Sequence, residues 1–163
     1  MLMRRARPRQ ARAFSLVELL VVVAIMVVLA TVALANLSSR KNSTDLTSAS
    51  KQIAALLREA QSNAMAQEGG TVWGMHFENA TATAPFFALF SSRYSPTTTV
   101  GFYRLPAGVA YQPATLPSGT SRDVTFAEIT GAASASTSIG LYMPSNPAFS
   151  STITIASSGA VLF

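Results

Sequence analysis

The strongest constraint on this chain is a continuous apolar stretch near its start, over residues 14–37. As a helix, its 24 residues would be about 36 Å long, which exceeds the bilayer core of about 30 Å. Five arginines precede the stretch in a segment without acidic residues, and Arg40 and Lys41 follow it. This pattern predicts a single membrane-spanning helix, with the N-terminus in the cytoplasm and the remainder outside.

One charged residue interrupts the apolar stretch. Glu18 lies near its start, with apolar neighbours on both sides. An ionised carboxylate in lipid costs about 2.5–3.5 kcal/mol on insertion scales, so this side chain needs a partner. The alternative is that the carboxylate only reaches the membrane interface.

The sequence Arg-Ala-Phe-Ser-Leu-Val-Glu-Leu-Leu at residues 12–20 resembles the cleavage and methylation motif of type IV pilins and type II secretion pseudopilins. The resemblance implies that prepilin peptidase removes the basic leader, residues 1–13, by cutting between Ala13 and Phe14. The new Phe14 amine would then be methylated. The Glu18 carboxylate would pair with this amine on an adjacent subunit and set the axial register. Two departures from the family pattern are Ala13, where glycine is usual, and an apolar segment without proline.

An ordinary secretory signal is the alternative for this N-terminus. Ala-Leu-Ala at residues 33–35 fits its cleavage pattern, and a soluble β-domain would be released after Ala35. Against this, the apolar run is longer than the usual apolar region of about 7–15 residues. The spacing of Phe14 and Glu18 would also be a coincidence.

The helix is expected to continue to residue 68. No proline lies between Pro8 and Pro85, and the first glycines, Gly69 and Gly70, are typical of a helix end. Over residues 38–68, apolar residues recur at spacings of three and four, which predicts one face packed on a globular domain. A coiled coil is the alternative. The face consists of Leu46, Ala49, Ile53, Leu56, Leu57, Ala60, Ala64 and Met65.

Residues 69–163 predict an antiparallel β-domain of six to eight short strands. Turn-forming residues separate short apolar or alternating runs, and segments 79–85 and 130–138 are expected to be surface loops. The predicted fold class is therefore α+β, with a long N-terminal helix packed on a C-terminal antiparallel β-domain. The runs lie at 71–77, 86–90, 100–105, 109–111, 124–126, 139–142, 152–156 and 160–163.

The order of these elements is similar to the GspH/FimT family of minor pseudopilins and minor pilins. The matching pieces are residues 56–64, Leu-Pro-Ala-Gly-Val at 105–109 and the final hairpin at 153–161. The resemblance implies a structural minor subunit of a type IV pilus or a type II secretion pseudopilus. Its partners would be prepilin peptidase, other pilin or pseudopilin subunits and the inner-membrane assembly platform. Before assembly it would be a single-pass protein of the inner membrane.

The residue inventory points away from catalysis. The chain has no cysteine and a single histidine, so thiol chemistry, cysteine-ligated metals and histidine clusters are excluded. We expect His76 to be structural or exposed, and Asp123 and Glu128 to be solvated carboxylates that flank a strand. No nucleotide-binding or nucleophile motif is present. The prediction is a non-enzyme with no catalytic, cofactor-binding or metal site.

The net charge of +5 belongs to the leader, because the rest of the chain has seven basic and seven acidic residues. Binding of DNA phosphates needs clustered cations, and only three arginines follow the helix. Arg93-Tyr94 and Tyr103-Arg104 do place a cation beside an aromatic ring, as in single-strand binders. A DNA-uptake minor pilin therefore stays as an alternative, while the sequence favours no nucleic-acid partner.

Overall fold

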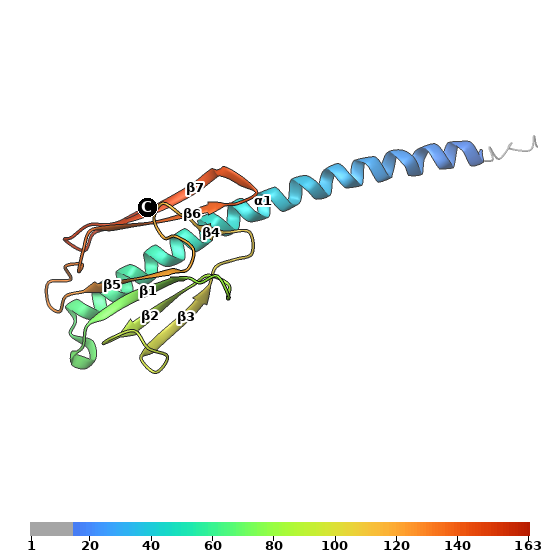
Figure 1. The fold of residues 1–163 in the computed structure, drawn as a ribbon. Helices are drawn as coiled ribbons and strands as arrows, with labels where there is room; N and C mark the ends of the chain where they lie inside the picture. The colour runs from blue at the N-terminus through green and yellow to red at the C-terminus, as the bar shows by residue number, and fades with distance from the viewer. Residues whose placement is uncertain (1–14) are drawn as a thin grey trace, which may run out of the picture. The chain divides into compact units, whose positions relative to one another are not determined.

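The computed structural model describes the backbone of residues 15–163 and the side chains of residues 15–31 and 43–163. The described part contains the helix α1 (Leu16–Met65), a short 3-10 turn η1 (Glu68–Gly70) and eight strands (Figure 1). The chain divides into two compact units, Met1–Ser39 and Arg40–Phe163.

The predicted continuous helix is present as α1, and it ends at Met65, three residues before the predicted end. The reason is local, because Gln67 has a left-handed φ of 54° that an α-helix cannot contain. Gly69 and Gly70, with φ of 68° and 59°, continue the turn toward the first strand. The two glycines therefore complete a helix end that begins at Gln67.

The second half of α1 packs on strands of its own chain. Of the predicted apolar face, all members except Met65 are buried, and they join one hydrophobic core with strand residues such as Met75 and Phe77. Met65 remains exposed because the helix ends there. The coiled-coil alternative is wrong, and the predicted packing of a helix on antiparallel strands is confirmed.

The strands form two antiparallel sheets of four strands each in the described part of the chain. The order in the first sheet is β3-β2-β1-β5, and in the second it is β4-β6-β7-β8. The strands of the first sheet are β1 (Trp73–Asn79), β2 (Phe86–Ser91), β3 (Thr99–Arg104) and β5 (Thr120–Phe126). Those of the second are β4 (Ala110–Tyr111), β6 (Thr137–Met143), β7 (Asn146–Ile155) and β8 (Val161–Leu162).

The predicted terminal hairpin is formed by β7 and β8, with Ile155 opposite Val161. Its turn needs glycine at position 159, where φ is 89°. A Cβ atom at Gly159 would also collide with the Gly131 carbonyl oxygen and the Gln61 amide. Gln61 Nε2 donates a hydrogen bond to that carbonyl at 3.1 Å, and Arg58 Nη2 donates one to the Val161 carbonyl at 3.0 Å, so the hairpin contacts α1 directly.

One expected strand limit and one expected loop differ in the structure. Strand β5 begins at Thr120 rather than at residue 124, so Asp123 lies inside a strand instead of flanking one. Strand β6 begins at Thr137, and Ala133 forms an isolated bridge with Phe126. The predicted loop 130–138 is therefore partly ordered by the sheets, because pairing with distant strands overrides its small polar composition.

Candidate functional site

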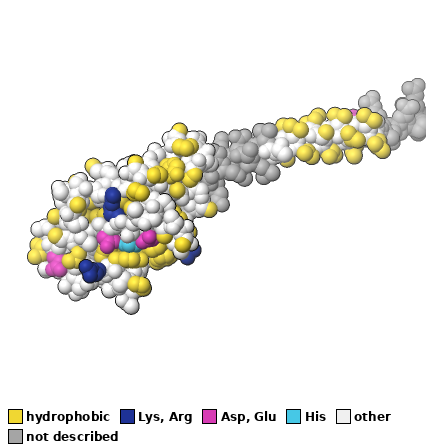
Figure 2. Space-filling model, viewed as in Figure 1, with side chains coloured by type: hydrophobic (Ala, Val, Ile, Leu, Met, Phe, Trp, Pro, Cys, Tyr) yellow, Lys and Arg dark blue, Asp and Glu magenta, His cyan; other side chains and the backbone are white. Residues whose placement is uncertain are grey.

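The first half of α1 has no covering surface within the described chain. Every described residue from 15 to 31 is exposed, and the large apolar side chains are between 45% (Val22) and 79% (Leu16) exposed. Figure 2 shows apolar side chains along this segment. A helix that is apolar on all sides is typical of a membrane span or the interior of a larger assembly.

Glu18 lies on the first turn of α1 and is exposed. A carboxylate at this end is favoured by the helix dipole, because backbone N–H groups there lack helical partners. Ala13 and Phe14, the predicted cleavage and methylation residues, lie outside the described residues. Phe14 and the side chains of residues 32–37, parts of the predicted membrane span, also lie outside them. Searched over its described residues, the chain has no helix that is both long and apolar enough to cross a membrane.

The most highly connected polar cluster lies on the outer face of the first sheet, around His76. In the register of β1 and β5, His76 is directly opposite Asp123. His76 Nδ1 is 2.5 Å from Asp123 Oδ1, and Nε2 is 3.1 Å from Glu78 Oε2. Figure 2 shows the chain's single histidine between acidic side chains. The imidazole ring therefore lies between two carboxylates, one on its own strand and one on β5.

A loop covers this cluster. The segment 92–98, between β2 and β3, places the Tyr94 ring on the His76 ring, with centroids 3.6 Å apart and an interplanar angle of 2°. Tyr94 also meets Phe90 edge-on, and His76 is left only 5% exposed. Burial raises the pKa of Tyr94, and the Glu78 and Asp123 carboxylates raise it further, so its hydroxyl stays neutral.

The cluster corrects one expectation and supports another. His76 is structural, as expected, whereas Asp123 is not part of a solvated pair with Glu128 but a partner of His76. No single-sequence signal gives the register that brings β1 and β5 together. Among the described residues, no group of three or more His, Cys, Asp or Glu side chains is arranged to hold a metal ion. The stacking of Tyr94 on His76 therefore holds loop 92–98 against the first sheet. We refer to His76, Glu78, Tyr94 and Asp123 as the His76 cluster.

Comparison with known proteins finds a match for the N-terminal motif and a match for the fold. The prokaryotic N-terminal methylation motif matches residues 8–34. The crystal structure of the type IV minor pilin FimU of Pseudomonas aeruginosa (strain PAO1) has a similar fold, with a TM-score of 0.51. The sequences are 13% identical, and the similarity covers 74% of this chain and 88% of that chain. The fold of this chain is therefore similar to that of a type IV minor pilin. A search of the curated proteins finds no match.

In the unit Arg40–Phe163, both tyrosines of the predicted cation–aromatic pairs contact rings of the same chain. Tyr94 is stacked on His76, and the Tyr103 ring lies 5.5 Å from that of Phe87 against the core. The Arg104 guanidinium lies 6.0 Å from the centre of the Phe102 ring rather than beside a tyrosine. Each tyrosine therefore has one ring face engaged within the chain, on His76 or on Phe87.

Proposed function

We propose that this chain is a structural minor subunit of a pilus or pseudopilus. The observation that carries the proposal is the exposed apolar surface of residues 15–31, which bears a single carboxylate, Glu18, and is attached to a domain with its own core. The methylation motif and the similarity to a type IV minor pilin support it. In this proposal the chain is not an enzyme but the substrate of one, prepilin peptidase.

The proposed sequence of events starts with a precursor in the inner membrane. The leader, residues 1–13, stays in the cytoplasm, and residues 14–37 anchor the chain. Residues 38–68 and the β-domain, 69–163, lie outside. Prepilin peptidase cuts between Ala13 and Phe14 and the Phe14 amine is methylated. The assembly platform then moves the helix from lipid into a bundle of helices contributed by other subunits.

The Glu18 carboxylate gives this transfer its specificity. Lipid tails are as apolar as leucine, so burying residues 15–31 among other helices brings little hydrophobic gain over the membrane. Close packing and polar pairs must therefore select the register. A carboxylate that meets a Phe14 ammonium group on the neighbouring subunit is stabilised only in one axial position, because an uncompensated charge is costly there.

The fold fits both members of the pilus and pseudopilus class, including a GspH/FimT-type subunit, and the proposal is stated at that level. DNA uptake is not favoured, because the tyrosines of both candidate pairs are engaged within the domain. Release of a soluble β-domain after Ala35 is not favoured, because the apolar run is longer than the usual apolar region of a secretory signal, about 7–15 residues.

The decisive experiment determines the residue at which the mature chain begins. Membranes from cells with active or inactivated prepilin peptidase are compared by intact mass and by N-terminal peptide mass spectrometry. We expect a chain that starts at Phe14 and is heavier by one methyl group, about 14 Da, only with the active peptidase. A chain that starts at Asn36 in both strains would overturn the proposal. The Ala13→Gly variant should shorten the lifetime of the precursor, because glycine is the residue that the motif usually has before the cut.

A further inference from the structure

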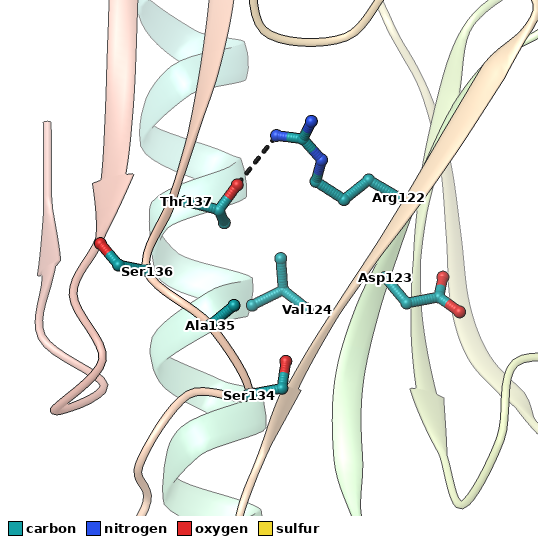
Figure 3. Close-up of a pocket in the computed structure, with 7 residues that line it drawn as sticks. All are labelled: Arg122, Asp123, Val124, Ser134, Ala135, Ser136 and Thr137. Atoms are coloured by element: carbon teal, nitrogen blue, oxygen red, sulfur yellow. Dashed lines mark hydrogen bonds between the residues drawn. The ribbon is translucent and has the colours of Figure 1, made fainter.

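The two sheets leave a gap between β5 and β6. Strand β5 ends the first sheet and pairs only with β1, apart from the bridge between Phe126 and Ala133. Strand β6 pairs with β7 along its length, but with β4 only at Leu141 and Tyr142. A pocket of about 460 Å³ lies between β5 and the segment that leads into β6. Residues 122–124 and 134–137 line it, and Figure 3 shows them on the two sides.

Unpaired backbone groups face this gap from β5. Thr125 accepts a hydrogen bond from Ser134 N–H at 2.8 Å, so its peptide groups point away from β1. In an antiparallel ladder this direction alternates, which turns the N–H and C=O groups of Ser121 and Asp123 toward the gap as well. The short distance between His76 and Asp123 agrees, because side chains approach most closely at pairs that do not exchange backbone hydrogen bonds.

The same argument applies to β6. Gln112 N–H donates to the Gly140 carbonyl at 2.7 Å, so the peptide groups of Gly140 point to the β4 side. Alternation then directs the N–H and C=O groups of Ser138, near the start of β6, to the gap. Two free strand edges thus face one space, and a free edge is a template for the addition of another strand.

The positive charge of Arg122 determines which kind of segment the gap between β5 and β6 favours. Arg122 Nη1 donates to Thr137 Oγ1 at 2.8 Å and, more weakly, approaches the Ser138 carbonyl at 3.5 Å. In the described chain, no carboxylate forms an ion pair with Arg122. The Asp123 side chain points away from the pocket, as Figure 3 shows. A guanidinium group with five donors and only neutral acceptors is complementary to a carboxylate.

We propose that an extended acidic segment of a neighbouring filament subunit adds as a strand between β5 and β6 and places an aspartate or glutamate on Arg122. The added strand would use the peptide groups of Asp123 and the N–H group of Ser138, while the exposed Ala135 offers a small apolar contact to one of its side chains. This inference rests on the proposed function as a filament subunit.

The chemistry is tested with the full chain in detergent micelles and two synthetic peptides. The peptides are acetyl-Thr-Val-Thr-Glu-Thr-Val-Thr-amide and the same peptide with a central Gln. We expect the Glu peptide to shift the NMR signals of the Ser121, Asp123, Ser136 and Ser138 amides, and to bind about tenfold more tightly than the Gln peptide. Equal affinities, no shifts at millimolar peptide, or equal shifts along the β3 edge would overturn the proposal.

Variants at the same site provide the controls. Arg122→Gln should abolish the preference for the Glu peptide, whereas Thr137→Val should keep it, because the cation remains. Arg122→Lys should retain part of the preference and shows whether charge alone is sufficient. The amide spectrum of each variant, taken without peptide, shows that the fold is intact. A preference that persists in Arg122→Gln would contradict the assignment of the carboxylate to Arg122.

The source of the segment is tested in assembled filaments. The chain has no cysteine, so Ser136→Cys and Ser145→Cys each introduce a single thiol, in the gap and in the turn between β6 and β7. We expect maleimide to label both variants in membranes, and the Ser136→Cys thiol to be labelled several-fold more slowly in sheared filaments. Equal labelling of both thiols in filaments would overturn this inference alone. Failure of either variant and of the unmodified chain to enter filaments would instead contradict the proposed function.

Discussion

The two halves of α1 share one continuous backbone and differ in where their partners lie. In the described part of the first half, residues 15–31, every side chain is exposed. In the second half, leucine, isoleucine and alanine side chains at spacings of three and four are buried against strands of the same chain. The second half therefore has its packing partners within the chain, whereas the described residues of the first half have none there.

The polar groups show the same contrast. Glu18 has no described cation near it, while Glu78 and Asp123 share His76 within one sheet. In the described residues, no buried side-chain nitrogen or oxygen lacks a hydrogen-bond partner. Changes in the unit Arg40–Phe163 should therefore affect stability, and changes in residues 15–31 should affect assembly.

The largest expected effect is on the buried helix face. Leu57 is fully buried, so Leu57→Ala should lower the free energy of unfolding by about 2–5 kcal/mol, from lost burial and the cavity left behind. The matched change Val23→Ala, on the exposed half, should leave it unchanged. Denaturant unfolding in detergent, followed by the fluorescence of Trp73, measures both. Equal destabilisation by the two changes would contradict the conclusion that only the second half of α1 packs within the chain.

The next effect is on assembly. Glu18→Ala should leave cleavage largely intact and reduce incorporation into sheared and pelleted filaments about tenfold or more, because the register-setting pair is lost. Glu59→Ala, an exposed glutamate in the second half of α1, is the control and should incorporate normally. Normal incorporation of Glu18→Ala would remove the pairing role, while the processing pathway would stand.

The features that the sequence predicts are those set by residues close together in the chain. The features that it does not predict depend on contacts between distant segments. The buried face of α1 and the strand segments were predictable because periodicity is local. The Phe14–Glu18 motif was recognisable because its residues lie close together in the sequence. The division into two sheets, the His76–Asp123 contact and the gap at Arg122 were not, because each depends on a register between segments about 15 to 50 residues apart.

A smaller effect on the free energy of unfolding is expected at the His76 cluster. His76→Phe keeps a ring for Tyr94 to stack on but removes both contacts to carboxylates, so we expect a loss of about 1 kcal/mol in unfolding free energy. The value is modest because the Asp123 and Glu78 side chains are 49% and 26% exposed and are screened by water. In a double-mutant cycle with Asp123→Asn, the two effects should not add. Reduced filament incorporation at unchanged stability would place the cluster in assembly instead.

The smallest effect concerns alkaline pH. Burial, with a further contribution from Glu78, raises the pKa of Tyr111 well above its ordinary value of 10, and its hydroxyl donates to the Phe86 carbonyl at 2.9 Å. The unfolded chain loses this proton near pH 10 while the folded chain keeps it, so stability should be constant below that pH and fall above it. Tyr111→Phe should cost about 0.5–1.5 kcal/mol at pH 7 but flatten the decline between pH 9 and 11. Denaturation midpoints across this range measure both, and an unchanged alkaline slope would show that a group other than Tyr111 carries the dependence.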